Sequence, residues 1–178
     1  MKLSSLPHQL DADAGTCLAV VETPKGSRNK FTYDERLGAF LLKALLPDGM
    51  SFPMEFGFVP STLAEDGDPL DVMVLADEPC RPGTVLEVRL LGVIEAEDVK
   101  HGKTERNDRL LAAAAVSNLY AKVKTVEDLG EDFTRNLVQF WVNKDALEGK
   151  QFNCLGVAGP DKATERVKRT AGAARKKR

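Results

Sequence analysis

The chain has 178 residues, of which 43% are hydrophobic and 29% are charged, and its formal net charge is -2 at pH 7. This length fits one domain with a sizeable core and a short tail, and the composition is that of a soluble globular protein. A net charge so close to zero creates no global field that would attract nucleic acid or an anionic substrate, so any anion site must be local.

The N-terminal segment and the cysteines indicate a cellular compartment. Residues 1–8 lack the apolar core of a signal peptide, and no run approaches the roughly 18 apolar residues that span a bilayer. Cys17, Cys80 and Cys154 are odd in number and form no CxxC pair, which argues against a disulfide framework or a zinc site and fits a reducing compartment. We therefore expect a cytoplasmic protein that does not enter a membrane.

The first two-thirds of the chain has the pattern of short β-strands separated by turns. Apolar or alternating runs are bounded by Gly, Pro and Asp residues, which end strands. The expected strands are 17–22, 30–34, 39–46, 70–75, 84–92 and 109–116.

The pattern becomes helical after Lys124. Residues 125–128 resemble a capping box that opens a short helix. Residues 131–148 then predict a helix with one apolar face, ended by Gly149. The residues of that face are Phe133, Leu137, Phe140 and Trp141. Strands first and helices last predict an α+β fold that is mainly β, with a small barrel or a strongly bent sheet.

The last segment, residues 162–178, is strongly basic. It could be an arm for nucleic acid or an anionic surface, or a solvated tail. The run has no aromatic residue on which a base could stack, which favours the tail. We therefore expect a domain of residues 1–160 followed by a tail of residues 161–178 that is helical or frayed, and we do not expect nucleic acid as a partner.

An acidic cluster gives the most specific signal. Residues 65–71, Glu-Asp-Gly-Asp-Pro-Leu-Asp, put four carboxylates into seven positions ahead of an apolar strand. Crowded like charges need bulk water or bound cations. Gly67 and Pro69 bend the chain so that Asp66, Asp68 and Asp71 can converge, and such oxygens suit hard ions, Mg²⁺ above all. The alternative is a solvated acidic turn before a strand.

Several catalytic motifs are absent. The chain has no GxxxxGK[ST] loop, no GxGxxG turn and no GxSxG elbow. Only His8 and His101 are available, so a Ser-His-Asp triad or a histidine-rich metal site is hard to build. Carboxylates with scattered Lys and Arg remain, and this combination suits phosphoryl chemistry.

The run Asp66-Gly67-Asp68-Pro69-Leu70-Asp71-Val72 resembles the signature of the family I soluble inorganic pyrophosphatases. Further similar segments follow the same order over most of the chain. They are 21–24, Lys30, 52–60, 81–84, 91–94, 107–112 and 147–150. The resemblance implies an OB-like five-stranded β-barrel with helices packed outside, the main helix near the C-terminus. It also implies hydrolysis of pyrophosphate to two phosphates with Mg²⁺ or another hard divalent cation. Because bacterial-type relatives are commonly hexamers, it implies a homo-oligomer as well.

The resemblance also implies roles for individual residues. Asp66 and Asp71 would ligate the activating metals, Asp98 would ligate metal that arrives with the substrate, and Glu22 would support the metal site through water. Asp68 would be the base that takes a proton from the attacking water. The cations that would hold phosphate oxygens are Lys30, Arg109 and Lys144. Taken without the family, each of these residues also has an ordinary structural role, such as a solvated lysine or an acidic loop.

This chain departs from the family pattern at several site positions. Two tyrosines are replaced by Phe52 and Phe56, and a third by Asn143. A glutamate is replaced by Thr32, an arginine is missing near Ala44, and an acidic residue is replaced by Val99. Each lost hydrogen bond to phosphate costs about 1 to 3 kcal/mol, so we expect an inorganic diphosphatase of reduced activity.

One departure affects the metal site directly. The metal-binding aspartate of the family falls on Asn107, with Asp108 beside it. If Arg109 faces the site on a strand, so does Asn107, whereas Asp108 points the other way, unless a bulge intervenes. Asn107 would be a weak ligand, because its amide oxygen carries no charge. The alternatives are a non-catalytic homologue that binds metal and phosphate, and a hydrolase of another phosphoanhydride.

Overall fold

The structure, a computed structural model, describes residues 2–177, with side chains up to Ala174. Within this range the strands are β1 (Thr16–Thr23), β2 (Asn29–Asp34), β3 (Ala39–Leu45), β4 (Glu55–Phe58), β5 (Asp71–Leu75), β6 (Val85–Lys100), β7 (Lys103–Arg106), β8 (Arg109–Ala114) and β9 (Gln151–Ala158). The helices are α1 (Glu131–Leu147) and α2 (Pro160–Lys177), with 3-10 turns η1 (Leu3–Ser5) and η2 (Glu127–Leu129).

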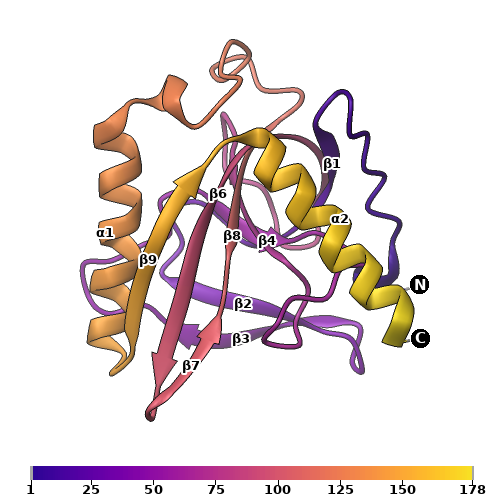
Figure 1. The fold of residues 1–178 in the computed structure, drawn as a ribbon. Helices are drawn as coiled ribbons and strands as arrows, with labels where there is room; N and C mark the ends of the chain where they lie inside the picture. The colour runs from indigo at the N-terminus through magenta and orange to yellow at the C-terminus, as the bar shows by residue number, and fades with distance from the viewer. Residues whose placement is uncertain (1, 178) are drawn as a thin grey trace.

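Five strands close into a ring (Figure 1). They pair in the order β1-β4-β5-β8-β6, and β6 pairs again with β1. All of these pairs are antiparallel except β5 with β8. The long strand β6 also carries β7 and β9 on its second half. The predicted mainly β fold, with five closed strands and helices outside them, is confirmed.

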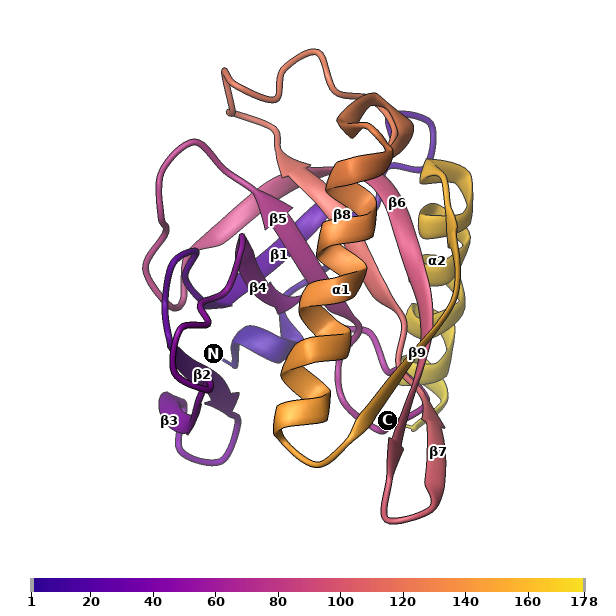
Figure 2. The ribbon, with the colours of Figure 1, turned by 90° about the vertical axis from the view of Figure 1, so that its left-hand side faces the viewer.

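The two helices cover different parts of the ring (Figure 2). Alternate residues of β5 and β8 belong to two buried clusters, because successive side chains of a strand point to opposite faces. Helix α1 contributes Leu137 and Trp141 to the cluster that contains Met73 and Leu111. Helix α2 contributes Ala163 and Val167 to the other cluster. No helix among residues 2–177 is long and apolar enough to cross a membrane.

The basic C-terminal segment is helical, and one face of the helix is buried. Residues 160–177 form α2, and Ala163, Val167 and Ala171 are buried. These three residues recur at intervals of four, so they form one apolar stripe along the helix, while Lys168 and Arg169 are exposed. The stripe was present in the sequence, but the charge of the segment obscured it.

Strand β6 also differs from the prediction. It extends to Lys100, beyond the predicted end at residue 92, so residues 95–98 lie within a strand. The pairing of these residues with β7 and β9 explains the extension, and both of these partner strands were missed, as was β4. The helix predicted over 131–148 is confirmed, and Gly149 follows it with a φ of 70°.

Candidate active site

A pocket of about 410 Å³ opens beside the acidic loop, between the β2–β3 hairpin and the ends of β4 and β5. The hairpin is tied to β1 by side chains: the backbone N–H of Phe31 donates to Thr23 Oγ1 over 2.9 Å, and that of Tyr33 donates to Glu22 Oε1 over 2.7 Å. Six of the nine predicted site residues line this pocket. They are Glu22, Lys30, Asp66, Asp68, Asp71 and Asn107.

The acidic loop has the bend that its glycine predicts. Gly67 has a φ of 92°, in the left-handed region that favours glycine. The carboxylate of Asp66 accepts a hydrogen bond of 3.0 Å from the backbone N–H of Asp68, and Ala64 N–H donates to Asp68 O over 2.8 Å. Asp71 then begins β5, beside Phe58 on β4 and Arg109 on β8. The loop therefore presents its three aspartates to one pocket.

The electrostatics of this pocket favour a bound cation. Burial raises the pKa of Asp71 to about 7, although Arg109 and Lys30 oppose the shift. Burial also raises the pKa of Glu22 to about 7, although the hydrogen bond from the backbone of Tyr33 lowers it. Burial and then Lys144 lower the pKa of Lys30. Burial therefore raises the free energy of the ionised carboxylates, and a bound divalent cation would lower it again.

The donors present fit a hard divalent ion. They are carboxylate and amide oxygens, which such ions prefer. In the part of the chain that the structure describes, no three or more Asp, Glu, His or Cys side chains already form a metal cage. Mg²⁺ usually keeps several waters and shares its other positions with phosphate oxygens.

Arg109 and Lys144 lie behind the pocket rather than in its lining. Arg109 is 3% exposed, and its Nη2 lies 3.1 Å from Asp98 Oδ2. Lys144 is also 3% exposed, and its Nζ lies 2.9 Å from both Asp145 and Glu148. Each buried cation is therefore paired with carboxylates, and Lys30 is the one predicted phosphate-binding cation found in the pocket lining.

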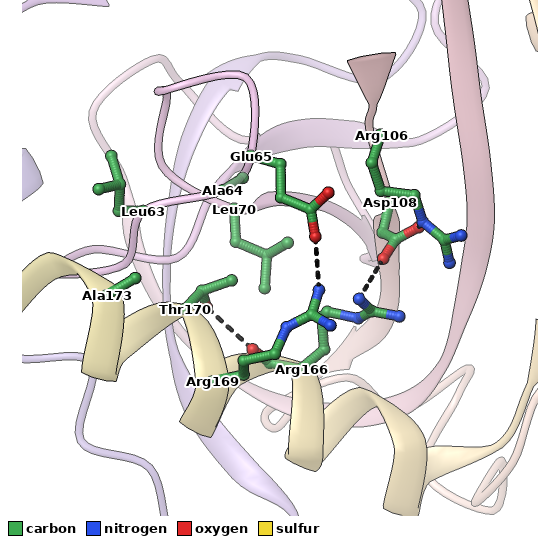
Figure 3. A pocket seen from close by; sticks show the side chains of 10 residues that line it. All are labelled: Leu63, Ala64, Glu65, Leu70, Arg106, Asp108, Arg166, Arg169, Thr170 and Ala173. Carbon is green, nitrogen blue, oxygen red and sulfur yellow. Dashed lines mark hydrogen bonds and ion pairs between the residues drawn. The ribbon is translucent and has the colours of Figure 1, made fainter. Parts of the chain in front are cut away.

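Asn107 and Asp108 face opposite sides, as strand alternation predicts. Asn107 lines the pocket, and its Nδ2 donates to Asp98 Oδ2 over 2.8 Å. Asp108 points away and accepts from Arg106 Nε over 2.6 Å. Its other carboxylate oxygen lies 2.9 Å from Arg166 Nη1 (Figure 3). Of the two, only Asn107 is directed toward the predicted metal ligands.

Helix α2 contacts the outer side of the acidic loop, and residues of both line a second pocket there (Figure 3). Arg169 Nη2 lies 3.0 Å from Glu65 Oε1, and the backbone N–H of Leu63 donates to Thr170 O over 3.1 Å. The loop that carries Asp66 and Asp68 is therefore held by the C-terminal helix.

Comparison with known proteins agrees with this geometry. A model of the family described as inorganic pyrophosphatase matches residues 19–175. The chain belongs to this family. It is 39% identical over 140 residues to the inorganic pyrophosphatase of Thermus thermophilus, covering 79% of this chain and 78% of that one. It is 35% identical over 156 residues to the inorganic pyrophosphatase of Synechocystis, covering 88% and 89%.

Solved structures of the family have the same fold. The crystal structure of the Thermus thermophilus inorganic pyrophosphatase matches with a TM-score of 0.90 at 34% identity, covering 98% of this chain and 99% of that one. The structure from Neisseria gonorrhoeae matches with a TM-score of 0.89 at 26% identity, covering 98% and 99%. Inorganic pyrophosphatases use divalent metal ions, which agrees with the oxygen donors of the pocket.

The residues that depart from the pyrophosphatase pattern have different surroundings. Phe56 lines the pocket, whereas Phe52 does not and packs against Phe140 and Trp141. Thr32 also lines the pocket. Phe56 and Thr32, together with Asn107, are therefore the departures in the pocket lining, where they can change how a substrate is held.

Two features of this pyrophosphatase site were not predicted from the sequence. Ser4, Tyr33 and Glu35 line the pocket, since the N-terminal turn packs against the hairpin. Trp141, assigned only to the core, lies 4.2 Å from the Arg109 guanidinium and 5.6 Å from Lys144 Nζ. The spacing of Trp141 and Lys144 on one helix face was a usable signal, but the contact with Arg109 depends on tertiary packing.

Proposed function

We infer that this chain is an inorganic diphosphatase that hydrolyses pyrophosphate to two phosphates. The observation that carries this conclusion is the convergence of carboxylates and a lysine in one pocket of a chain that matches the inorganic pyrophosphatase family over residues 19–175. Pyrophosphate is thus the proposed substrate.

We propose Mg²⁺ as the ion. Asp66 and Asp71 would hold it directly, Asn107 would contribute weakly through its amide oxygen, and Glu22 would act through water. When bound, a divalent ion lowers the pKa of water and offsets phosphate charge. The donor chemistry of the pocket and the raised pKa of Asp71 support this choice.

The protein's own groups would then act as follows. Asp68, exposed at the loop tip, accepts a proton from the water that attacks one phosphorus. Lys30 donates hydrogen bonds to phosphate oxygens within the pocket. Arg109 and Lys144 lie behind the pocket, and each contacts phosphate only if it leaves part of its carboxylate pairing. That pairing supports the expectation of reduced activity.

Phosphate release from pyrophosphate, with and without Mg²⁺, tests the function on the wild type, Asp68→Asn and a matched control, Asp13→Asn. Asp13 lies in an exposed loop outside the pocket. We expect Mg²⁺-dependent release that Asp68→Asn lowers at least about 100-fold and that Asp13→Asn leaves unchanged. Binding of pyrophosphate without turnover by the wild type would instead indicate a non-catalytic homologue. Faster turnover of tripolyphosphate or ATP would indicate another phosphoanhydride.

We also propose a cytoplasmic homo-oligomer, with a hexamer as the first candidate. Exposed apolar side chains on β9 and on the loop after β8 support association. They are Val116, Leu119, Leu155 and Val157. Light scattering coupled to size-exclusion chromatography measures the subunit count, and a monomer at micromolar concentration would contradict the proposal.

A further inference from the structure

Asp98, Asn107 and Arg109 form a hydrogen-bonded cluster at the edge of the pocket. Asp98 Oδ2 accepts from Asn107 Nδ2 over 2.8 Å and from Arg109 Nη2 over 3.1 Å. Arg109 Nη2 also lies 3.4 Å from Asp98 Oδ1. One carboxylate and one guanidinium cancel in charge, so the cluster is neutral without any added ion.

The guanidinium of Arg109 is fixed in this position. It lies between two rings, 4.2 Å from the centroid of Trp141 and 4.9 Å from that of Phe152. Its Nη1 donates to Asn107 O over 3.0 Å, and the side chain is 4% exposed. Leaving Asp98 would require Arg109 to give up both ring contacts and a buried ion pair, which is costly.

The amide of Asn107 is fixed as well. A carboxylate only accepts hydrogen bonds, so the NH₂ end of Asn107 must face Asp98 and its oxygen must face away from it. A cation coordinated by Asp98 Oδ2 would have to displace this NH₂ group. It would also lie within a few ångströms of the Arg109 charge, in a partly desolvated place where repulsion is strong.

We propose that Asp98 is not a metal ligand in this chain, and that the Asn107–Asp98–Arg109 cluster occupies the place of a divalent ion. Because of Asn107, the pocket binds only the ions that the acidic loop holds. This inference rests on the proposed metal-dependent function. Arg109 balances the charge of Asp98 at every metal concentration, so this edge of the pocket stays neutral whatever the ion loading.

The substitution Asn107→Asp tests this directly. It replaces an NH₂ donor by a second carboxylate beside Asp98, so the cluster becomes net negative and two carboxylates face one another. A divalent ion would then relieve the repulsion. Asn136→Asp on the exposed face of α1 makes the same chemical change outside the pocket and is the matched control.

The measurement is the number of Mn²⁺ ions bound per chain, alone and with methylenediphosphonate, a diphosphate analogue without a P–O–P bond, from electron paramagnetic resonance and isothermal titration calorimetry. We expect Asn107→Asp to bind one ion more than the wild type, and Asn136→Asp to bind the same number as the wild type. An unchanged number in Asn107→Asp would overturn the proposal.

Asp98→Asn gives an independent test. If Asp98 is not a ligand, this variant binds as many Mn²⁺ ions as the wild type even with methylenediphosphonate present, and loss of one ion would overturn the proposal. A melting curve confirms that the variant is folded before titration. The phosphate-release assay separates the two levels of inference. A wild type that turns over pyrophosphate but fails the Mn²⁺ tests contradicts only this proposal, whereas a wild type that binds no Mn²⁺ contradicts the metal-dependent function too.

Discussion

Asp71 and Arg109 are direct partners in the parallel pairing of β5 and β8. This register sets a carboxylate beside a buried guanidinium, and Arg109 lowers the pKa of Asp71 against the larger effect of burial. The same pairing brings the acidic loop, which precedes β5, next to Asn107, which precedes β8. The pocket is thus assembled where two parallel strands begin.

Asp71→Asn should separate function from stability. We expect at least about a 100-fold loss of phosphate release, because a proposed metal ligand loses its charge. Without metal and at pH 8, the variant should be at least as stable as the wild type. The reason is that the pKa of Asp71 is raised to about 7, so its ionised form costs folding free energy above that pH. Urea unfolding in the presence of a chelator measures this.

Glu65→Gln is the matched control for that substitution. Glu65 lies on the same loop but is paired with Arg169 and does not line the active pocket. Its activity should stay within about twofold of the wild type, since exposed ion pairs contribute little. Near-normal turnover by Asp71→Asn would show that the metal assignment is wrong.

Phe56→Tyr should change the rate, whereas Phe52→Tyr should change the stability. Phe56 lines the pocket, so a hydroxyl there can donate to phosphate and raise kcat by up to about tenfold. Phe52 is 2% exposed and packs among Phe56, Phe140 and Trp141. A hydroxyl there is buried and unpaired, so Phe52→Tyr should lower the unfolding free energy by about 1 to 3 kcal/mol without a rate gain. Equal rate gains in both variants would contradict this distinction.

Local rules predicted the parts of the site that depend on neighbouring residues. The Gly67 bend and the alternation of Asn107 and Asp108 follow from backbone geometry alone. The burial of Arg109 does not, because it depends on Trp141 of α1 and Phe152 of β9, which are distant in sequence. Strand β9 itself was missed, because it is held by pairing with the second half of β6, which is distant in sequence.

Glu55 should make stability depend on pH. It is fully buried, and its carboxylate accepts hydrogen bonds from the backbone N–H groups of Lys25 and Cys80, each over 3.2 Å. Burial nevertheless raises its pKa above the ordinary value of 4.5. The folded state therefore binds more protons than the unfolded state just above pH 4.5, and stability falls as pH rises through the folded pKa.

Glu55→Gln removes the charge and keeps an acceptor oxygen for one of the two hydrogen bonds, because Lys25 and Cys80 donate to different carboxylate oxygens. The variant should show a smaller loss of unfolding free energy than the wild type as the pH rises above 4.5. Urea unfolding at several pH values measures the difference. Glu35→Gln is a useful comparison, since Glu35 is half exposed and paired with Lys2. Equal pH dependence of Glu55→Gln and the wild type would rule out this role for Glu55.

Arg166 and Arg169 of α2 should differ in their contributions to stability. Arg166 is 6% exposed and lies 2.8 Å from Glu95 and 2.9 Å from Asp108. Arg166→Met leaves Asp108 buried with one fewer partner and should lower the unfolding free energy by about 3 kcal/mol or more. Arg169 pairs with Glu65 at the surface, so Arg169→Met should cost less than about 1 kcal/mol. Similar losses in both variants would contradict the assignment.

Helix α2 should be required for folding, which would make the whole chain one domain. Ala163 and Val167 complete the cluster that contains Val72, Val74 and Leu110, so a chain ending at Gly159 would expose these strand residues to water. We expect it to lose cooperative urea unfolding and activity. A chain ending at Gly172 keeps the buried stripe and the Leu63–Thr170 hydrogen bond, so it should fold and stay active. Full activity of the shorter chain would instead establish residues 1–159 as an independent domain and α2 as dispensable.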